Sequence, residues 1–227
     1  MIGIIGAMAT ETRRVQDAMT ETKTEKIGFA TFVSGKVGEQ EVVLATCGIG
    51  KVFAAACTEA MILKYAPKAI INIGVGGALT RSLNIGDGVI GTTAVQYDMD
   101  TSAIGDPLGW LSGLDLIHLP CDEALQVKLE KALKAEGIPY QKGVIATADR
   151  FVDDDRNRDI CRQFGALAED MEGAAVGQVC VAHGVPFGIL RTISNGDENA
   201  GEVYENSAEM AAEALCRGVL KIFSETC

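Results

Sequence analysis

The sequence predicts an α/β fold: a single domain with a largely parallel or mixed central sheet flanked by helices. Three observations lead to this prediction. The chain has 227 residues, of which 48% are hydrophobic, enough to bury a full core. Short apolar runs alternate along it with helical patterns, as in sheets covered on both faces. No Pro- or Ser-rich linker or repeat divides the chain, so we expect residues 1–227 to form one domain.

The first half of the chain opens with a buried strand, IGIIG, and a helix from about Thr10 to Met19. The segment FATFVSGKVGEQEVVLATCG predicts a hairpin whose two β-rich runs join through Gly35 to Gly38. An alanine-rich helix follows from Val52 to Tyr65, with Pro67 just beyond its end. AIINIGVGG and GDGVIGTTAVQY are two more strands. Residues 98 to 120 have little periodicity and predict a long loop of the kind that forms binding sites or interfaces.

The second half alternates in the same way. Asp122 to Glu136 is an amphipathic helix, and shorter helices are expected near Arg156–Phe164 and Gly173–His183. KGVIATA, GALAEDM and FGILRTIS are the strands. The last helix has one apolar face, formed by Leu215, Val219, Ile222 and Phe223.

Composition narrows the possible partners. The net charge of −11 disfavours nucleic acids and anionic membrane surfaces, which are themselves negatively charged. The seven cysteines form no C-x-x-C pair, and several lie in apolar runs, where a free thiol is a small buried hydrophobe. The start, MIGIIGAM, lacks the basic residues of a signal peptide, and no apolar run is long enough to cross a bilayer. We expect a cytoplasmic protein.

Motifs for cofactors and metals are incomplete. GIGKVF at 48–53 lacks the flanking residues of a phosphate loop, and GVGGAL at 74–79 has only part of a dinucleotide fingerprint. His118 and His183 are far apart and match no metal-ligand spacing. We therefore predict no cofactor and no metal.

The carboxyl ends of strands are where α/β sheets bind ligands. Polar or flexible residues follow most of the predicted strands and would meet at one edge. They are Glu11, Gly76, Gly77, Asp149, Phe151, Met171, Glu172, Ser194, Asn195 and Asp197.

A set of ordered motifs carries a family resemblance. IGIIGAM followed by Glu11, then CGIGKV, IINIGVGGAL, ADRFV, EDMEGAAV and RTISN, occur in this order along nearly the whole chain. Together they resemble the methylthioadenosine/S-adenosylhomocysteine nucleosidases of the purine nucleoside phosphorylase superfamily. The resemblance implies a hydrolase in which water cleaves a purine–ribosyl bond, the N-ribosidic bond of a 5′-substituted nucleoside, as in methionine salvage. Hydrolysis is favoured over phosphorolysis because a carboxylate at Glu11 would repel phosphate.

The resemblance also implies roles for individual residues. Glu11 matches the glutamate that activates water, although a helix-start carboxylate is the plainer interpretation of its position. Glu172 matches the residue that binds the ribose hydroxyls, and otherwise would be a capping residue. Arg191 matches an arginine beside the water, or is a structural ion-pair partner. The other matched residues line the substrate: Met8, Ile49, Val75, Gly76, Phe151, Val152 (through its backbone), Met171 and Ser194.

One departure concerns the purine. The family has Ser-Asp where this chain has Ser194-Asn195, and an amide cannot give up a proton near neutral pH. An asparagine can donate a hydrogen bond to O6, so a preference for 6-oxopurine nucleosides, such as methylthioinosine, inosine or futalosine, stays open. Asp197 is a possible substitute for the aspartate. A non-catalytic nucleoside-binding module is a further alternative. A second departure is Val75, where many relatives have serine.

The long loop predicts contact with a second subunit. Relatives are homodimers in which this region reaches the neighbour's active site. The resemblance therefore implies a homodimer in which Ile104, Leu108 and Trp110 form an apolar wall around the 5′ group of a nucleoside bound to the partner, rather than packing within their own subunit.

Overall fold

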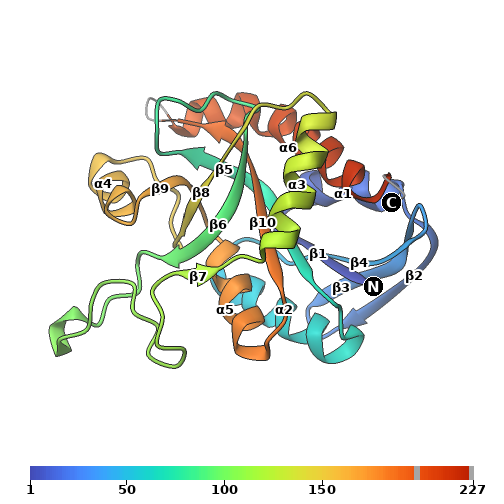
Figure 1. Cartoon of the computed structure of the whole chain (residues 1–227), viewed down its shortest axis with the longest axis horizontal. Coiled ribbons are helices and arrows are strands. Elements are labelled where there is room, and N and C mark those ends of the chain that lie inside the picture. Colours follow the sequence, from blue (N-terminus) through green and yellow to red (C-terminus); the bar gives the residue numbers. More distant parts are fainter. Residues whose placement is uncertain (197–199, 225–227) are drawn as a thin grey trace.

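Figure 1 shows the computed structural model of the chain, which describes residues 1–196 and 200–224. The strands of this described part form one ten-stranded mixed sheet in the order β10-β6-β8-β9-β5-β1-β4-β3-β2, with β7 paired to β6. β10 also pairs with β5, so β5, β10, β6, β8 and β9 close into a ring. The α/β class and the mixed sheet are confirmed.

The bounds of the elements are as follows. The strands are β1 (Ile2–Gly6), β2 (Thr20–Ile27), β3 (Ala30–Val37), β4 (Gln40–Thr46), β5 (Ile70–Ala78), β6 (Gly88–Gln96), β7 (Leu119–Pro120), β8 (Tyr140–Thr147), β9 (Ala166–Asp170) and β10 (Phe187–Asn195). The helices are α1 (Ala9–Asp17), α2 (Lys51–Tyr65), the short 3-10 helix η1 (Ser102–Ile104), α3 (Glu123–Ala135), α4 (Asp155–Gln163), α5 (Gly173–His183) and α6 (Ala200–Ser224).

Helices cover the sheet on both faces (Figure 1). α1, α3 and α6 lie above it in this view, and α2 and α5 lie below. Successive residues of a strand point to opposite faces. Accordingly, Ile4 packs into the cluster under α1, α3 and α6, whereas Ile5 packs into the cluster over α2 and α5. Burial on both faces explains why the central strands appear in the sequence as unbroken apolar runs.

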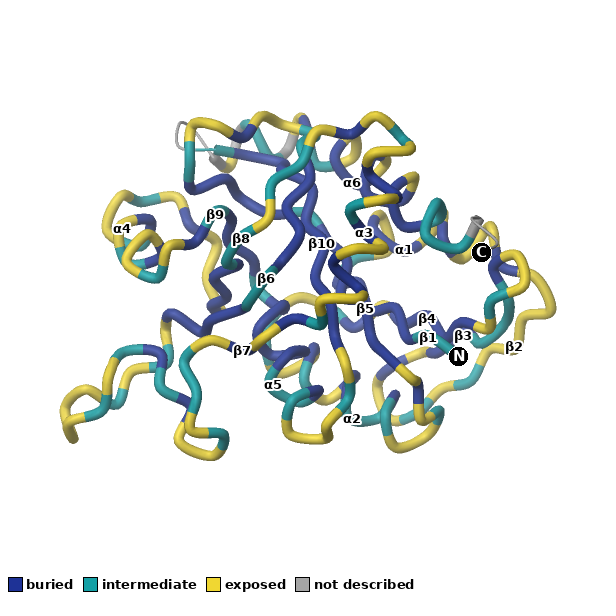
Figure 2. Tube along the Cα trace, viewed as in Figure 1, coloured by how far each residue is buried: buried dark blue, intermediate teal, exposed yellow. Residues whose placement is uncertain are grey.

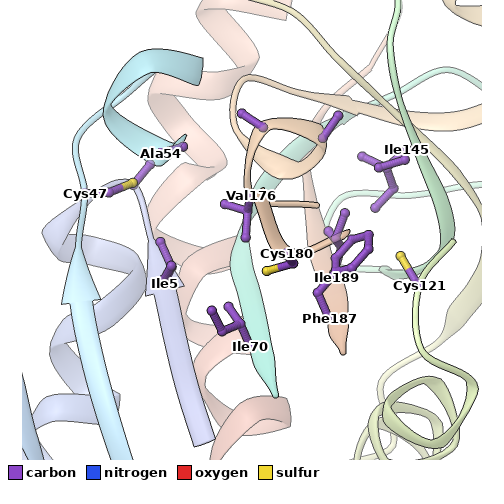
Figure 3. Close-up of a cluster of buried hydrophobic side chains, with 14 of the residues drawn as sticks. Ile5, Cys47, Ala54, Ile70, Cys121, Ile145, Val176, Cys180, Phe187 and Ile189 are labelled. Carbon is purple, nitrogen blue, oxygen red and sulfur yellow. The ribbon is translucent and has the colours of Figure 1, made fainter. Parts of the chain in front are cut away.

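The cluster between the sheet and α5 is drawn in Figure 3. Val176 and Cys180 of α5 lie among Ile70, Phe187 and Ile189 of the strands. These residues are completely or almost completely buried. α5 is apolar on most of its surface, because both the sheet and α2 pack against it.

The hairpin differs from its prediction in two respects. Gly35 lies within β3, paired with Val42, and the chain reverses after Val37, at Gly38 and Glu39. Gly38 has a φ of 58°, a conformation that favours glycine and that marks the true turn. The structure also has a third strand here, β2, which pairs with β3. Its residues, TETKTEKI, are mostly exposed and charged, as is common for an edge strand, so no apolar run announces it.

Residues 98–118 project away from the body at the lower left of Figure 1, and most of this segment is exposed or half-buried in Figure 2. The predicted long loop is therefore confirmed, with η1 and the short β7 inside the predicted range. Cys47, Cys57, Cys121, Cys161, Cys180 and Cys216 are free and buried, as expected. Among the described residues, no helix is long and apolar enough to cross a membrane.

Candidate active site

A cavity of about 300 Å³ opens where the carboxyl ends of the central strands meet the starts of α1 and α5. Its size is at the lower end of the range for small-molecule sites. The cavity brings together most of the residues that the sequence suggested. It is lined by Ala7, Met8, Glu11, Ile49, Val75, Gly76, Gly77, Phe151, Glu169, Asp170, Met171, Glu172, Ser194, Asn195 and Tyr204.

Glu11 is held by backbone N–H groups from two elements. Oε2 accepts from Ala7 at 2.8 Å and from Met8 at 2.9 Å, and Oε1 accepts from Val75 of β5 at 2.9 Å. Burial raises the pKa of Glu11, while these three donors and the Arg191 charge oppose that rise. A carboxylate with three N–H donors is stabilised in its ionised form, which is the form that can accept a proton.

Glu172 reaches across the cavity mouth. It stands at the start of α5, yet its Oε1 accepts from the backbone N–H of Gly50, before α2, at 2.9 Å. The free N–H groups of the first turn of α5 are bonded by other residues: Asp170 accepts from Gly173, and the Thr147 hydroxyl accepts from Ala174. Burial, followed by the charge of Asp170, raises the pKa of Glu172 to about 7. The side chain is therefore not a helix cap, and it faces the same cavity as Glu11.

Asn195 ends β10 at an irregularity of the sheet. The register between β10 and β5 shifts between Ile193 and Asn195, which is the signature of a bulge that re-aims a side chain. Oδ1 of Asn195 accepts from the Ser194 hydroxyl at 2.9 Å. Its Nδ2 lies above Gly77, where an added β-carbon would be only 3.0 Å from it. The amide therefore presents its N–H donors to the cavity.

Arg191 does not line the cavity. Arg191 is 1% exposed, and its Nη2 lies 2.6 Å from Oδ2 of Asp170 and also donates to Oδ1 of Asn72. Arg191 and Glu11 both approach Gly74. A side chain at this position would lie against the Glu11 carboxyl and the Arg191 guanidinium, so the glycine lets the two groups come close to each other. Of the two roles considered from the sequence, the structure shows the buried ion pair. The charge of Arg191 also opposes the rise that burial causes in the pKa of Glu11.

An apolar lid covers one side of the cavity. Phe151 and Tyr204 meet edge to face, with ring centroids 5.6 Å apart, and the Tyr204 hydroxyl lies 3.5 Å from Sδ of Met8. Tyr204 comes from α6 and was not a candidate from the sequence. The strand-end rule, applied only to residues near a strand, has no means of finding it. Glu169 and Asp170 were also missed, although both occur in the quoted run GALAEDM.

The remaining candidates lie apart from the cavity. The Val152 side chain packs against Val95 and Cys161 in a third apolar cluster, and its backbone contact to a purine stays a prediction. Ile104 is 81% exposed, and neither it nor Leu108 or Trp110 lines the cavity of its own chain. Asp197 lies outside the described residues.

Comparison with known proteins identifies the family of the chain. A family model described as the phosphorylase superfamily matches residues 1–224. A 5′-methylthioadenosine/S-adenosylhomocysteine nucleosidase from Actinobacillus succinogenes is 37% identical, over 99% of this chain and 98% of that protein. The chain belongs to this nucleosidase family, within the phosphorylase superfamily.

Solved structures in the same superfamily have the same fold as this nucleosidase-family chain. The nucleosidase from Neisseria meningitidis, in complex with methylthio-immucillin-A, has a TM-score of 0.93 and 32% identity, covering 97% of each chain. The futalosine hydrolase of Helicobacter pylori has a TM-score of 0.94 and 31% identity, covering 99% of this chain and 97% of that one. The fold comparison therefore places this chain equally near to proteins with these two names.

Proposed function

We propose that this nucleosidase-family chain hydrolyses the N-ribosidic bond of a 5′-substituted purine nucleoside, as the names of its methylthioadenosine/S-adenosylhomocysteine nucleosidase relatives suggest. The family makes it an N-glycosyl hydrolase. The observation that carries the proposal is the meeting of Glu11 and Glu172, from different elements, in one buried cavity beside Phe151 and Met171. That cavity offers both a base for water and an apolar surface for a purine.

The chemistry follows from where charge develops. As the purine leaves, the sugar becomes positively charged, and nearby carboxylates stabilise it. Glu11, whose carboxyl group accepts three backbone hydrogen bonds, takes the proton of the attacking water. Glu172 accepts hydrogen bonds from the ribose hydroxyls, and Met171 packs against the sugar and the base. Phe151, 37% exposed at the cavity rim, stacks on the purine.

A 6-oxopurine nucleoside is the second candidate substrate, and the orientation of Asn195 favours it. Because Ser194 donates to Oδ1, the N–H donors at Nδ2 are the groups left for the base. O6 of hypoxanthine accepts a hydrogen bond, whereas the amino group of adenine at the same place is a donor. The likeness to futalosine hydrolase agrees with this candidate.

Released base from a panel of nucleosides tests the proposal. We expect the protein to release adenine or hypoxanthine from methylthioadenosine, S-adenosylhomocysteine, methylthioinosine, inosine or futalosine, at a rate independent of phosphate. Chromatography of the products with and without phosphate gives the answer. A phosphate requirement would make the chain a phosphorylase, and no release from any nucleoside would support a binding module.

The proposal includes a homodimer, because Ile104, Leu108 and Trp110 do not line the active-site cavity of their own chain. Val52 and Phe53, on the first turn of α2 near the cavity, are 76% and 48% exposed and would be covered by the partner. We expect Val52→Glu to yield monomers with reduced turnover in analytical ultracentrifugation and assays. Met210→Glu, on the opposite layer in α6, is the matched control and should leave the dimer intact. A monomeric, active wild type would contradict the dimer.

A further inference from the structure

We propose that Glu169 gives the departing purine its proton, the step that Asn195 is chemically unable to perform. This inference rests on the proposed function and names the acid of that reaction. Glu169 is the first residue of the motif EDMEGAAV, but the family resemblance gives it no role. Its place in the sheet shows its relation to the base-binding edge.

Glu169 and Asn195 lie on the two strands that flank β5. In the register of the sheet, Gly77 of β5 is opposite Glu169 of β9 on one side and opposite Asn195 of β10 on the other. A β-carbon added at Gly77 would overlap Oε1 of Glu169 and lie 3.0 Å from Nδ2 of Asn195. Both polar groups therefore converge over Gly77, on the side where a side chain is missing, and all three residues line the cavity.

Glu169 and Glu11 differ in the hydrogen bonds that reach their carboxyl groups. Three backbone N–H groups donate to Glu11. By contrast, none of the described residues donates a hydrogen bond to the Glu169 carboxyl, although the residue is only 5% exposed. Burial raises the pKa of Glu169 to about 8. Hydrogen-bond donors favour the ionised form of a carboxyl group, so of the two carboxyl groups Glu11 is suited to act as the base and Glu169 as the acid.

Charged and titratable groups face Glu169 from several elements. Asp170 and Glu172 favour its neutral form, whereas Arg158 of α4 and Arg191 of β10 favour its ionised form. Tyr97 and Cys161 lie close enough for the Glu169 charge to raise their pKa values as well. Desolvation and the two carboxylates outweigh the two arginines, so the carboxyl keeps its proton near neutral pH.

The spacing along β5 suits a nucleoside. Glu11 accepts from the N–H of Val75, and Glu169 lies over Gly77, two positions further along the strand. At about 3.3 Å per residue, these two anchor points are separated by roughly 7 Å. A sugar carbon under attack and the imidazole edge of its purine fit within that span.

The proposed step balances. The bond between C1′ of the sugar and N9 of the purine breaks, and both electrons stay with the purine. The proton of the Glu169 carboxyl goes to N7, which leaves Glu169 ionised and the purine neutral. The water oxygen bonds to C1′, and its proton goes to Glu11. Loss of that proton to solvent, and uptake of one by Glu169, restores the starting state.

The test compares Glu169→Gln with the wild type, using kcat for methylthioadenosine and methylthioinosine between pH 6 and 10. The amide keeps the shape and a hydrogen-bond donor but has no proton to transfer. We expect kcat of the wild type to fall as pH rises above about 8, because the acid form is lost. In Glu169→Gln, kcat should be lower by roughly 10²-fold, with little change in KM. The kcat of this variant should not decrease further at high pH. Glu169→Asp keeps a carboxyl group, so it should have a higher kcat than Glu169→Gln and should again show the decrease of kcat at high pH.

Several results would overturn the assignment. One is a Glu169→Gln variant whose kcat equals that of the wild type. Another is a variant whose kcat is reduced but still falls above about pH 8, as in the wild type, because this would show a purely structural role. Loss of the fall in Asp197→Asn, with its retention in Glu169→Gln, would assign the acid to Asp197. If Glu169→Gln unfolds, the same comparison is made with Glu169→Asp against the wild type, where disappearance of the fall would contradict the proposal. Base release from neither nucleoside by the wild type would instead remove the proposed function.

Discussion

Glu11→Gln is expected to lower kcat by about 10²- to 10⁴-fold while leaving purine binding nearly unchanged. The amide has almost the same shape as the carboxylate but cannot take a proton from water. KM and the affinity for free adenine or hypoxanthine should change little, because in the proposed mechanism Glu11 contacts the water and not the base. Steady-state kinetics and calorimetry with the free bases measure the two quantities separately.

The Glu11 variant needs a stability measurement, since the backbone around it offers three donors. In the wild type, Oε1 and Oε2 accept all three N–H groups. An amide has one acceptor oxygen, so its NH₂ group must oppose at least one of those donors, at a cost of about 1–3 kcal/mol in the free energy of unfolding. Urea unfolding will show whether the loss of kcat occurs in folded protein.

Glu59→Gln is the matched control for Glu11→Gln. Glu59 is a half-exposed carboxylate on α2, paired with His183 at 2.6 Å and outside the cavity. Its replacement should leave kcat unchanged. Activity of Glu11→Gln within a few-fold of the wild type would exclude Glu11 as the base and leave the cavity without its water-activating group.

The parts of the site that the sequence predicted are those tied to strand ends. Glu11, Phe151 and Glu172 each follow a run that forms a strand, which is where the strand-end rule looks for ligand-binding residues. The rule assumes parallel strands, and only β1, before Glu11, runs parallel to β5; β8 and β9, before Phe151 and Glu172, run parallel to each other, and β9 is antiparallel to β5. Such candidates need only the order of the elements. The same reasoning could not decide the function of Arg191, because an arginine in a buried strand goes to whichever carboxylate lies nearest, and that depends on packing.

The residues that the sequence missed depend on pairing between distant segments. Glu169 faces the cavity because β9 runs antiparallel to β5, whereas its other neighbour, β8, runs parallel to it. That change of direction cannot be inferred from the apolar runs alone. Tyr204 lies on α6 and meets Phe151 only because the last helix packs back over the sheet. The polar strand β2 was missed because its exposed residues carry no apolar signal.

Asn195→Asp should raise the preference for adenine nucleosides by roughly 10²-fold or more. The measured quantity is the ratio of kcat/KM for methylthioadenosine to that for methylthioinosine. A carboxylate at this place accepts from the amino group of adenine, whereas it repels O6 of hypoxanthine. Both substrates are measured on the same preparation, so the fraction of folded enzyme cancels from the ratio.

The effect of Asn195→Asp is reinforced by its neighbour across Gly77. The new carboxyl would converge on Glu169 over the same glycine, and two carboxyl groups so close cannot both ionise near neutral pH. The pair would hold one shared proton, so one oxygen accepts from the amino group of adenine while another donates toward N7. Removing the second carboxyl, in Asn195→Asp with Glu169→Gln, should therefore reduce the gain. A substrate ratio that stays at the wild-type value in the single variant would mean that Asn195 does not face the base, and that the preference is set elsewhere in the cavity.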